Sequence, residues 1–268
     1  MDPTRAGLTV AVIAALAAAA DAHELARSRT IYLAHDGARV TPGENDAGTT
    51  TSVLVAHPVA IPAWTATDAV WADTVTCVTA VYAPFAVTVT DVDPGDAPHI
   101  EVIFGGSPTM LGLGRDIAGI SPFTADCAVI ESSVVFAFTD ILGGDAASAC
   151  RVAVQEIGHS YGLDHELLLL DPMSFGHEHG ERKFHDEDAA CGESSPRPCG
   201  LAGSTCRATQ NSYALLADRI GLAGTDPDPP TDLGGCAATG SDAGALSIVV
   251  ASLLPYRRRR RAPRRFSA

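Results

Sequence analysis

The stretch QEIGHSYGLDH, residues 155–165, decides how this chain is interpreted. Side chains four positions apart lie on the same face of a helix, so Gln155 and His159 are placed to meet one metal ion. Glu156 stands between them, at the position from which a carboxylate points at a water molecule on that ion. The spacing therefore predicts a metal site on a helix, with a general base beside it.

A sharp turn and a third candidate ligand follow. Gly162 has the conformational freedom to turn the chain, and His165 comes three residues later. Downstream stands the sequence DPMS, residues 171–174, which contains Met173. The pattern H-E-x-x-H-x-x-G-x-x-H with a later methionine marks the metzincin metalloproteases. This chain resembles their matrixin-type branch, with Gln155 at the position of the first histidine.

The resemblance implies a fold. We expect an α+β, metzincin-like catalytic domain, in which a twisted mixed β-sheet packs against an active-site helix and a methionine turn. The similarity would extend over roughly residues 30–222. Leu163 and Met173 would form an apolar floor beneath the metal. A strand near residues 134–138 would be the edge strand that pairs with an extended peptide substrate through backbone hydrogen bonds.

The resemblance also implies an activity: a zinc-dependent endopeptidase, with Zn²⁺ as cofactor and an extended protein or peptide as substrate. A zinc ion lowers the pKa of a bound water to about 7, and the carboxylate takes the water's proton. The implied site comes from one segment and its methionine turn: Glu156 as general base, His159, His165 and Gln155 as metal ligands, and Gly162 and Met173 as structural residues.

Gln155 departs from the pattern. Zinc prefers nitrogen, sulfur or carboxylate oxygen, whereas an amide oxygen is a neutral, harder donor. Gln155 could coordinate through its side-chain oxygen, a water could replace it, or His177 or His179 could supply the missing ligand. Two alternatives to a zinc peptidase stay open: a catalytically weak or inactive metzincin-fold protein that serves in binding or adhesion, and a site for a harder ion such as calcium or manganese.

Hydrophobic periodicity and turn residues predict the main elements around this segment. Thr67 is a plausible N-cap for the first helix, and Ser212 for the last. The predicted strands are residues 30–34, 86–92, 99–104 and 129–138, and the predicted helices are residues 67–82, 146–161 and 212–220.

Both ends of the chain have the layout of targeting segments. Residues 1–22 combine an early arginine, an apolar run and a small-residue cleavage site, as in a secretory signal peptide, although an uncleaved anchor is the alternative. The metallopeptidase domain would then be residues 23–223, followed by a linker, residues 224–235. Residues 236–268 place a cysteine, an apolar stretch and an arginine cluster in order, which resembles the C-terminal sorting tails of myxobacterial surface proteins. The alternative is a tail without a role.

The cysteines agree with export, because disulfides form and persist in oxidising compartments. Six of the seven cysteines lie between residues 77 and 206, and Cys236 lies in the tail. Cys191, Cys199 and Cys206 could form a metal knuckle, but the Ser, Pro, Arg and Gly residues between them favour a loop closed by a disulfide. We therefore expect a secreted or surface-attached protein with disulfide bonds.

The charge distribution limits the partners. The formal net charge is −14, although seven of the 18 basic residues lie in the last twelve positions, so the body of the chain is more acidic still. Phosphate would repel such a body, which disfavours nucleic acid as a partner. We expect a monomer that contacts a membrane only through its terminal segments.

Overall fold

The computed structural model describes residues 25–175, 180–201 and 203–225. These residues belong to one compact unit, which ends at Pro227. The predicted signal peptide, residues 1–22, and the predicted tail, residues 236–268, lie outside the described residues, as does most of the predicted linker. His177 and His179 lie outside them as well.

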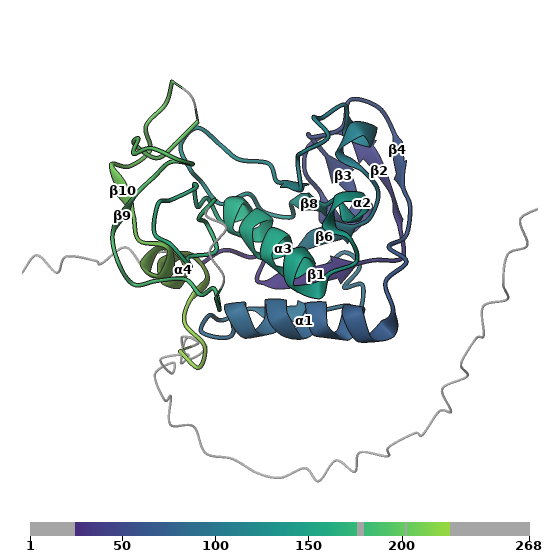
Figure 1. Ribbon diagram of the computed structural model, residues 1–268, viewed down its shortest axis with the longest axis horizontal. Helices are drawn as coiled ribbons and strands as arrows, with labels where there is room; N and C mark the ends of the chain where they lie inside the picture. The colour runs from purple at the N-terminus through teal and green to yellow at the C-terminus, as the bar shows by residue number, and fades with distance from the viewer. Residues whose placement is uncertain (1–24, 176–179, 202, 226–268) are drawn as a thin grey trace, which may run out of the picture. The chain divides into compact units, whose positions relative to one another are not determined.

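A five-stranded, twisted mixed sheet forms the centre of the molecule (Figure 1). Four of its strands are parallel, and the last strand pairs antiparallel with its neighbour. Across the sheet the strands follow the order β5 (Thr88–Thr90), β1 (Thr30–Ala34), β6 (His99–Phe104), β8 (Val134–Ala137) and β7 (Gly119–Ile120). With its few helices, this sheet confirms the expected α+β class.

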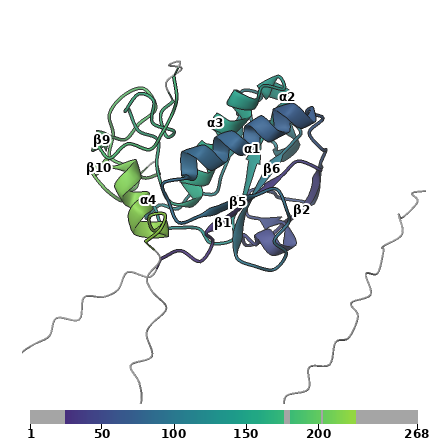
Figure 2. The same cartoon turned by 90° about the horizontal axis from the view of Figure 1, so that it is seen from below.

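Two helices cover one face of the sheet. Helices α1 (Asp68–Tyr82) and α3 (Ala146–Ser160) lie side by side (Figures 1 and 2). They bury Val102 and Val135 in one hydrophobic cluster. A disulfide between Cys77 and Cys150 joins the two helices. The helix that carries the metal motif is therefore fixed to its neighbour covalently and by packing.

The opposite face packs on a smaller sheet. Its strands β3 (Thr51–Ser52), β2 (Ala38–Pro42) and β4 (Val59–Ile61) lie near the short helix η1 (Ala47–Thr49). A second hydrophobic cluster fills this side, with Ile103, Val134, Phe136 and Phe138 facing Val40, Ala47, Val55 and Ile61. Strand β8 is therefore buried on both faces, as its continuous apolar sequence predicts.

The remaining elements are short. They are η2 (Pro108–Leu111), α2 (Thr139–Leu142), β9 (Ala189–Ala190), β10 (Thr209–Gln210) and α4 (Ser212–Ile220). Two more disulfides, Cys127–Cys206 and Cys191–Cys199, tie the irregular segments between them. Cys191 and Cys199 are bonded to each other, so the predicted loop closed by a disulfide is confirmed. The alternative, a metal knuckle formed by these cysteines, is wrong. None of the helices in the described part of the chain is long and apolar enough to cross a membrane.

The predicted elements agree closely where hydrophobic patterning is strong. Strands β1 and β6 and helix α4 have the predicted bounds, and Thr67 caps α1 by accepting a hydrogen bond from the backbone of Val70. The predicted cap Ser212 is wrong, because Asn211 accepts the capping hydrogen bond from Ala214.

Strands predicted at residues 86–92 and 129–138 are shorter than expected. They shrink to β5 and β8. Before β8 the chain bends at Ser132, whose φ of 51° is left-handed, and Ile130 donates its amide to the carbonyl of Ser160 instead of to a strand. The expected role of β8 as edge strand is wrong, because β7 lies outside it.

Candidate metal centre

Helix α3 and the turn after it bring the predicted ligands together. Asp145 caps the helix by accepting a hydrogen bond from Ser148, and the helix ends at Ser160. Gly162 then adopts a φ of +77°, and an added Cβ would collide with the carbonyl of Cys127. Only glycine fits this close approach comfortably. The turn it permits carries His165 back toward the helix.

His159 and His165 face each other. Their Nε2 atoms lie 3.0 Å apart. Two nitrogens at the usual zinc–nitrogen distance in a tetrahedral site are about 3.3 Å apart, so the spacing is close to that of two ligands on one ion. The rings meet edge to face, with centroids 4.6 Å apart. The structure thus joins two of the three predicted ligands.

The partners of the other ring nitrogens fix the tautomers. His159 Nδ1 lies 2.8 Å from the carbonyl oxygen of Leu163, and His165 Nδ1 lies 3.2 Å from a carboxylate oxygen of Glu193. Both oxygens are acceptors, so each Nδ1 carries the proton and each Nε2 presents a lone pair. Burial lowers the pKa of His159 to about 3 and also lowers the pKa of His165. Two lone pairs that face each other at this distance repel unless a cation lies between them.

The side chain of Gln155, like that of His159, is bound to a backbone carbonyl. Its amide nitrogen donates to the carbonyl of Pro172, in the methionine turn, at 3.3 Å. With the amide's donor used in this way, Oε1 remains as the acceptor, just as Nε2 does in each histidine. Gln155 lies one helical turn before His159 and so on the same side of α3. The hydrogen bonds of the described residues join it to neither histidine.

Glu156 is buried beside the edge strand. Its exposure is 7%, and burial raises the pKa of its carboxyl group to about 8. None of the described residues donates a hydrogen bond to this carboxylate. A methyl group on Gly119 of β7 would lie 2.7 Å from Glu156 Oε1. The absent side chain at Gly119 therefore leaves the space that the carboxylate occupies.

Met173 and Leu163 pack beneath the histidine-bearing end of α3. Both are fully buried. A Cβ on Gly158 would lie 2.5 Å from the Met173 sulfur and 3.6 Å from Leu163 Cδ1. The two side chains therefore press against the helix backbone next to His159, which agrees with an apolar floor.

Three residues near the centre have no signal in the sequence. Glu193, the partner of His165, lies 28 residues away along the chain. Phe123 and Phe175 contact the histidines edge to face, with ring centroids 5.7 Å from His159 and 4.5 Å from His165, respectively. An exposed glutamate in a loop and two isolated phenylalanines have no spacing that marks them in advance.

Two other groupings of metal-binding residue types do not fit a metal. Asp164 lies near Cys191 and Cys199, but these sulfurs form a disulfide and are not thiolates. The same aspartate lies near His165 and Glu193, but Arg197 already forms ion pairs with both carboxylates. The facing Nε2 atoms are therefore the better place for an ion.

A groove of about 790 Å³ lies elsewhere, against helices α1 and α3 and residues 180–186. Neither His159 nor His165 lines it, although Pro172 does. The chemistry of the side chains, not the size of a cavity, marks the candidate centre. No protein-family model and no curated protein sequence matches this chain.

Proposed function

We propose that this protein is a zinc-dependent endopeptidase with a metzincin-like catalytic domain. One observation carries the proposal: the Nε2 atoms of His159 and His165 lie 3.0 Å apart, and the remaining nitrogen of each ring lies at a hydrogen-bond acceptor. A ligating histidine characteristically donates its other N–H to a carbonyl or carboxylate, which orients the ring and raises its basicity. Both histidines meet that description.

The residues fit zinc. His159 and His165 would hold the ion through nitrogen, and Gln155 would complete the protein's ligand set through its amide oxygen. Such a three-ligand set leaves the fourth position open, as in catalytic zinc sites. When bound, zinc supplies a Lewis acid that polarises a peptide carbonyl and acidifies water.

Glu156 is the candidate general base. It neighbours Gln155 in sequence and precedes His159 by three positions, and it is buried without a hydrogen-bond donor among the described residues. A carboxylate in this setting is free to accept a proton from water and to deliver it to the leaving amine.

Strand β7 is the candidate docking edge for the substrate. It ends the five-stranded sheet, and Gly119 within it contacts Glu156. An extended peptide can add to such an edge through backbone hydrogen bonds. A peptide paired with β7 would pass next to Glu156, so its scissile bond would lie beside the proposed general base.

Two aromatic rings suggest a preference for apolar substrate side chains. Phe123 packs edge to face on His159, and Phe175 packs on His165. Phe175 is 51% exposed, which is unusual for so large an apolar side chain. A substrate residue with an aliphatic or aromatic side chain would bury this surface when it binds.

The proposed enzyme would act outside the cell. Three disulfides in the described residues suggest an extracellular or otherwise oxidising environment. The signal peptide proposed for residues 1–22 would export the chain, and the tail proposed for residues 236–268 would attach it to the outer surface.

Peptide hydrolysis by the zinc-loaded protein tests the proposal. We expect the wild type to cleave an unfolded protein substrate, and a chelator to abolish cleavage. Glu156→Gln should lower the rate by about 10²–10⁴-fold with its zinc content unchanged, because it removes only the base. Glu187→Gln, at an exposed glutamate, is the control. A Glu156→Gln variant at full rate would contradict the mechanism, and a wild type with neither zinc nor hydrolysis would favour the binding or adhesion alternative.

A further inference from the structure

A loop closed by a disulfide supplies the partner of His165. Cys191 and Cys199 are separated by eight positions in sequence, and Glu193 lies between them. The Oε1 atom of Glu193 lies 3.2 Å from His165 Nδ1 and also accepts a hydrogen bond from Arg197 at 2.7 Å. One loop thus provides both the carboxylate and the cation that holds it.

We propose that Glu193 is a positioning residue, which fixes the tautomer and orientation of His165 for metal binding, and that the Cys191–Cys199 disulfide holds Glu193 in place. This inference rests on the proposed metal site. It assigns to an irregular loop, remote in sequence from the motif, a direct effect on metal affinity.

Arg197 makes the arrangement rigid. Its guanidinium forms a two-pronged ion pair with Asp164, the residue before His165, at 2.5 and 3.0 Å. The same guanidinium reaches Glu193. A planar guanidinium bound to two carboxylates restricts both. Arg197 therefore connects the backbone that carries His165 to the carboxylate that orients its ring.

The same guanidinium pairs with the carboxylate that contacts His165. The carboxylate accepts a hydrogen bond from Arg197 at 2.7 Å and lies 3.2 Å from Nδ1 of His165. An ionised carboxylate is a stronger acceptor than an amide or a carbonyl and favours the protonated Nδ1 of His165. With Nδ1 engaged by Glu193, Nε2 is the nitrogen of His165 that faces His159.

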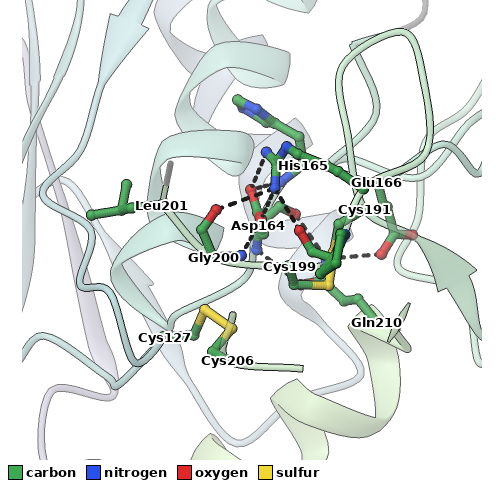
Figure 3. Close-up of polar contacts among 12 residues, drawn as sticks. Cys127, Asp164, His165, Glu166, Cys191, Cys199, Gly200, Leu201, Cys206 and Gln210 are labelled. Carbon is green, nitrogen blue, oxygen red and sulfur yellow. Dashed lines mark hydrogen bonds and ion pairs between the residues drawn. A yellow bond between two sulfur atoms is a disulfide. The ribbon is translucent and has the colours of Figure 1, made fainter. Parts of the chain in front are cut away.

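Further contacts anchor the loop to the chain around His165 (Figure 3). Asp164 accepts a hydrogen bond from the amide of Gly200 at 2.7 Å, just beyond the disulfide. Gly192 donates its amide to the carbonyl of His165 at 2.9 Å. With Glu193 nearly half exposed, these anchors and the disulfide, not burial, keep its carboxylate at His165.

Zinc affinity, measured by competition with a chromophoric chelator, tests the inference. Glu193→Ala should weaken zinc binding by about 10–100-fold, the usual effect of losing a partner of a metal-ligating histidine. Glu193→Gln keeps an acceptor and should recover part of the loss. The double variant Cys191→Ser, Cys199→Ser should resemble Glu193→Ala. Glu187→Ala, which changes an exposed acid outside the loop, should bind as the wild type does.

A measurement without metal separates this inference from the proposed function. In the metal-free protein, long-range ¹H–¹⁵N spectra should show His165 protonated at Nδ1 in the wild type and a mixture of tautomers in Glu193→Ala. An unchanged tautomer together with a zinc affinity within twofold of the wild type would overturn the inference. A wild type that binds no zinc would overturn the proposed function, whereas the tautomer comparison would still decide the role of Glu193.

Discussion

The side-chain amide of Gln155 donates to the carbonyl of Pro172 at 3.3 Å, so helix α3 is joined at the proposed ligand Gln155 to the segment that carries Met173. An imidazole could make the same hydrogen bond through Nδ1 and present Nε2 to the metal. In the proposed zinc site, Gln155 would therefore offer an amide oxygen at a position where an imidazole nitrogen would also fit.

Gln155→His should consequently bind zinc more tightly than the wild type, by on the order of tenfold or about 1.4 kcal/mol, because zinc prefers imidazole nitrogen to amide oxygen. Gln155→Leu should bind more weakly than the wild type. Isothermal titration with zinc measures both. Equal affinities for all three proteins would mean that position 155 does not contact the ion.

Gly119→Ala should disturb the proposed site from strand β7, next to Glu156. The new methyl group would lie 2.7 Å from Glu156 Oε1 and 2.5 Å from Val152 Cγ1. Overpacking of this kind costs about 1–3 kcal/mol, and here it also displaces the proposed base. We expect lower stability in urea and a larger loss of peptidase activity than of zinc affinity. Gly48→Ala is a matched control, because a Cβ there meets only ordinary contacts.

The pattern of residues 155–165 predicts only the part of the centre that local geometry dictates. Helical spacing places Gln155 and His159 on one side of α3, and the turn at Gly162 brings back His165. Glu193 could not be predicted, because its approach depends on a disulfide loop 28 residues further along the chain. The sequence does not indicate which cysteines pair, so it does not locate that loop.

In the fold, too, local sequence predicts some strands, whereas others depend on contacts between distant segments. Strands β1 and β6 are predicted because both are buried apolar runs. Strand β7 is missed because it has only two residues, and its place at the edge comes from pairing with β8 and from contact with Glu156. The wrong expectation that β8 is the edge strand comes from the family resemblance. Hydrophobicity indicates that β8 is buried but does not tell which strand lies beyond it.

Two disulfides should have separable effects. Cys77–Cys150 closes a loop of 73 positions and joins α1 to α3, whereas Cys191–Cys199 closes one of eight. Chain entropy assigns about 4 kcal/mol to the longer loop and about 2.5 kcal/mol to the shorter. Serine replacement of the first pair should cost more stability, and replacement of the second should cost more zinc affinity. Urea unfolding and zinc titration of both double variants check this, and the reverse order would contradict it.

Glu101 should make stability fall as the pH rises. Its side chain is buried in β6, one of its carboxyl oxygens has no partner among the described residues, and burial raises its pKa from 4.5 to about 7. Between these values the folded state binds a proton that the unfolded state has lost, so the free energy of unfolding decreases by up to about 3 kcal/mol.

Glu101→Gln removes this titration. The stability difference between the variant and the wild type should therefore move in favour of the variant between pH 4.5 and 8, and should be constant below pH 4. Urea unfolding of the metal-free proteins across this range measures the difference. A difference that does not vary with pH would show that Glu101 titrates normally.

Zinc stoichiometry is the decisive measurement for the proposed metal centre. Elemental analysis after dialysis should find one zinc per chain in the wild type and in His57→Ala, which changes an exposed histidine away from the site. His159→Ala and His165→Ala should each retain almost none. Equal zinc contents in all four proteins, or none in the wild type, would show that the two facing imidazoles do not form a metal centre.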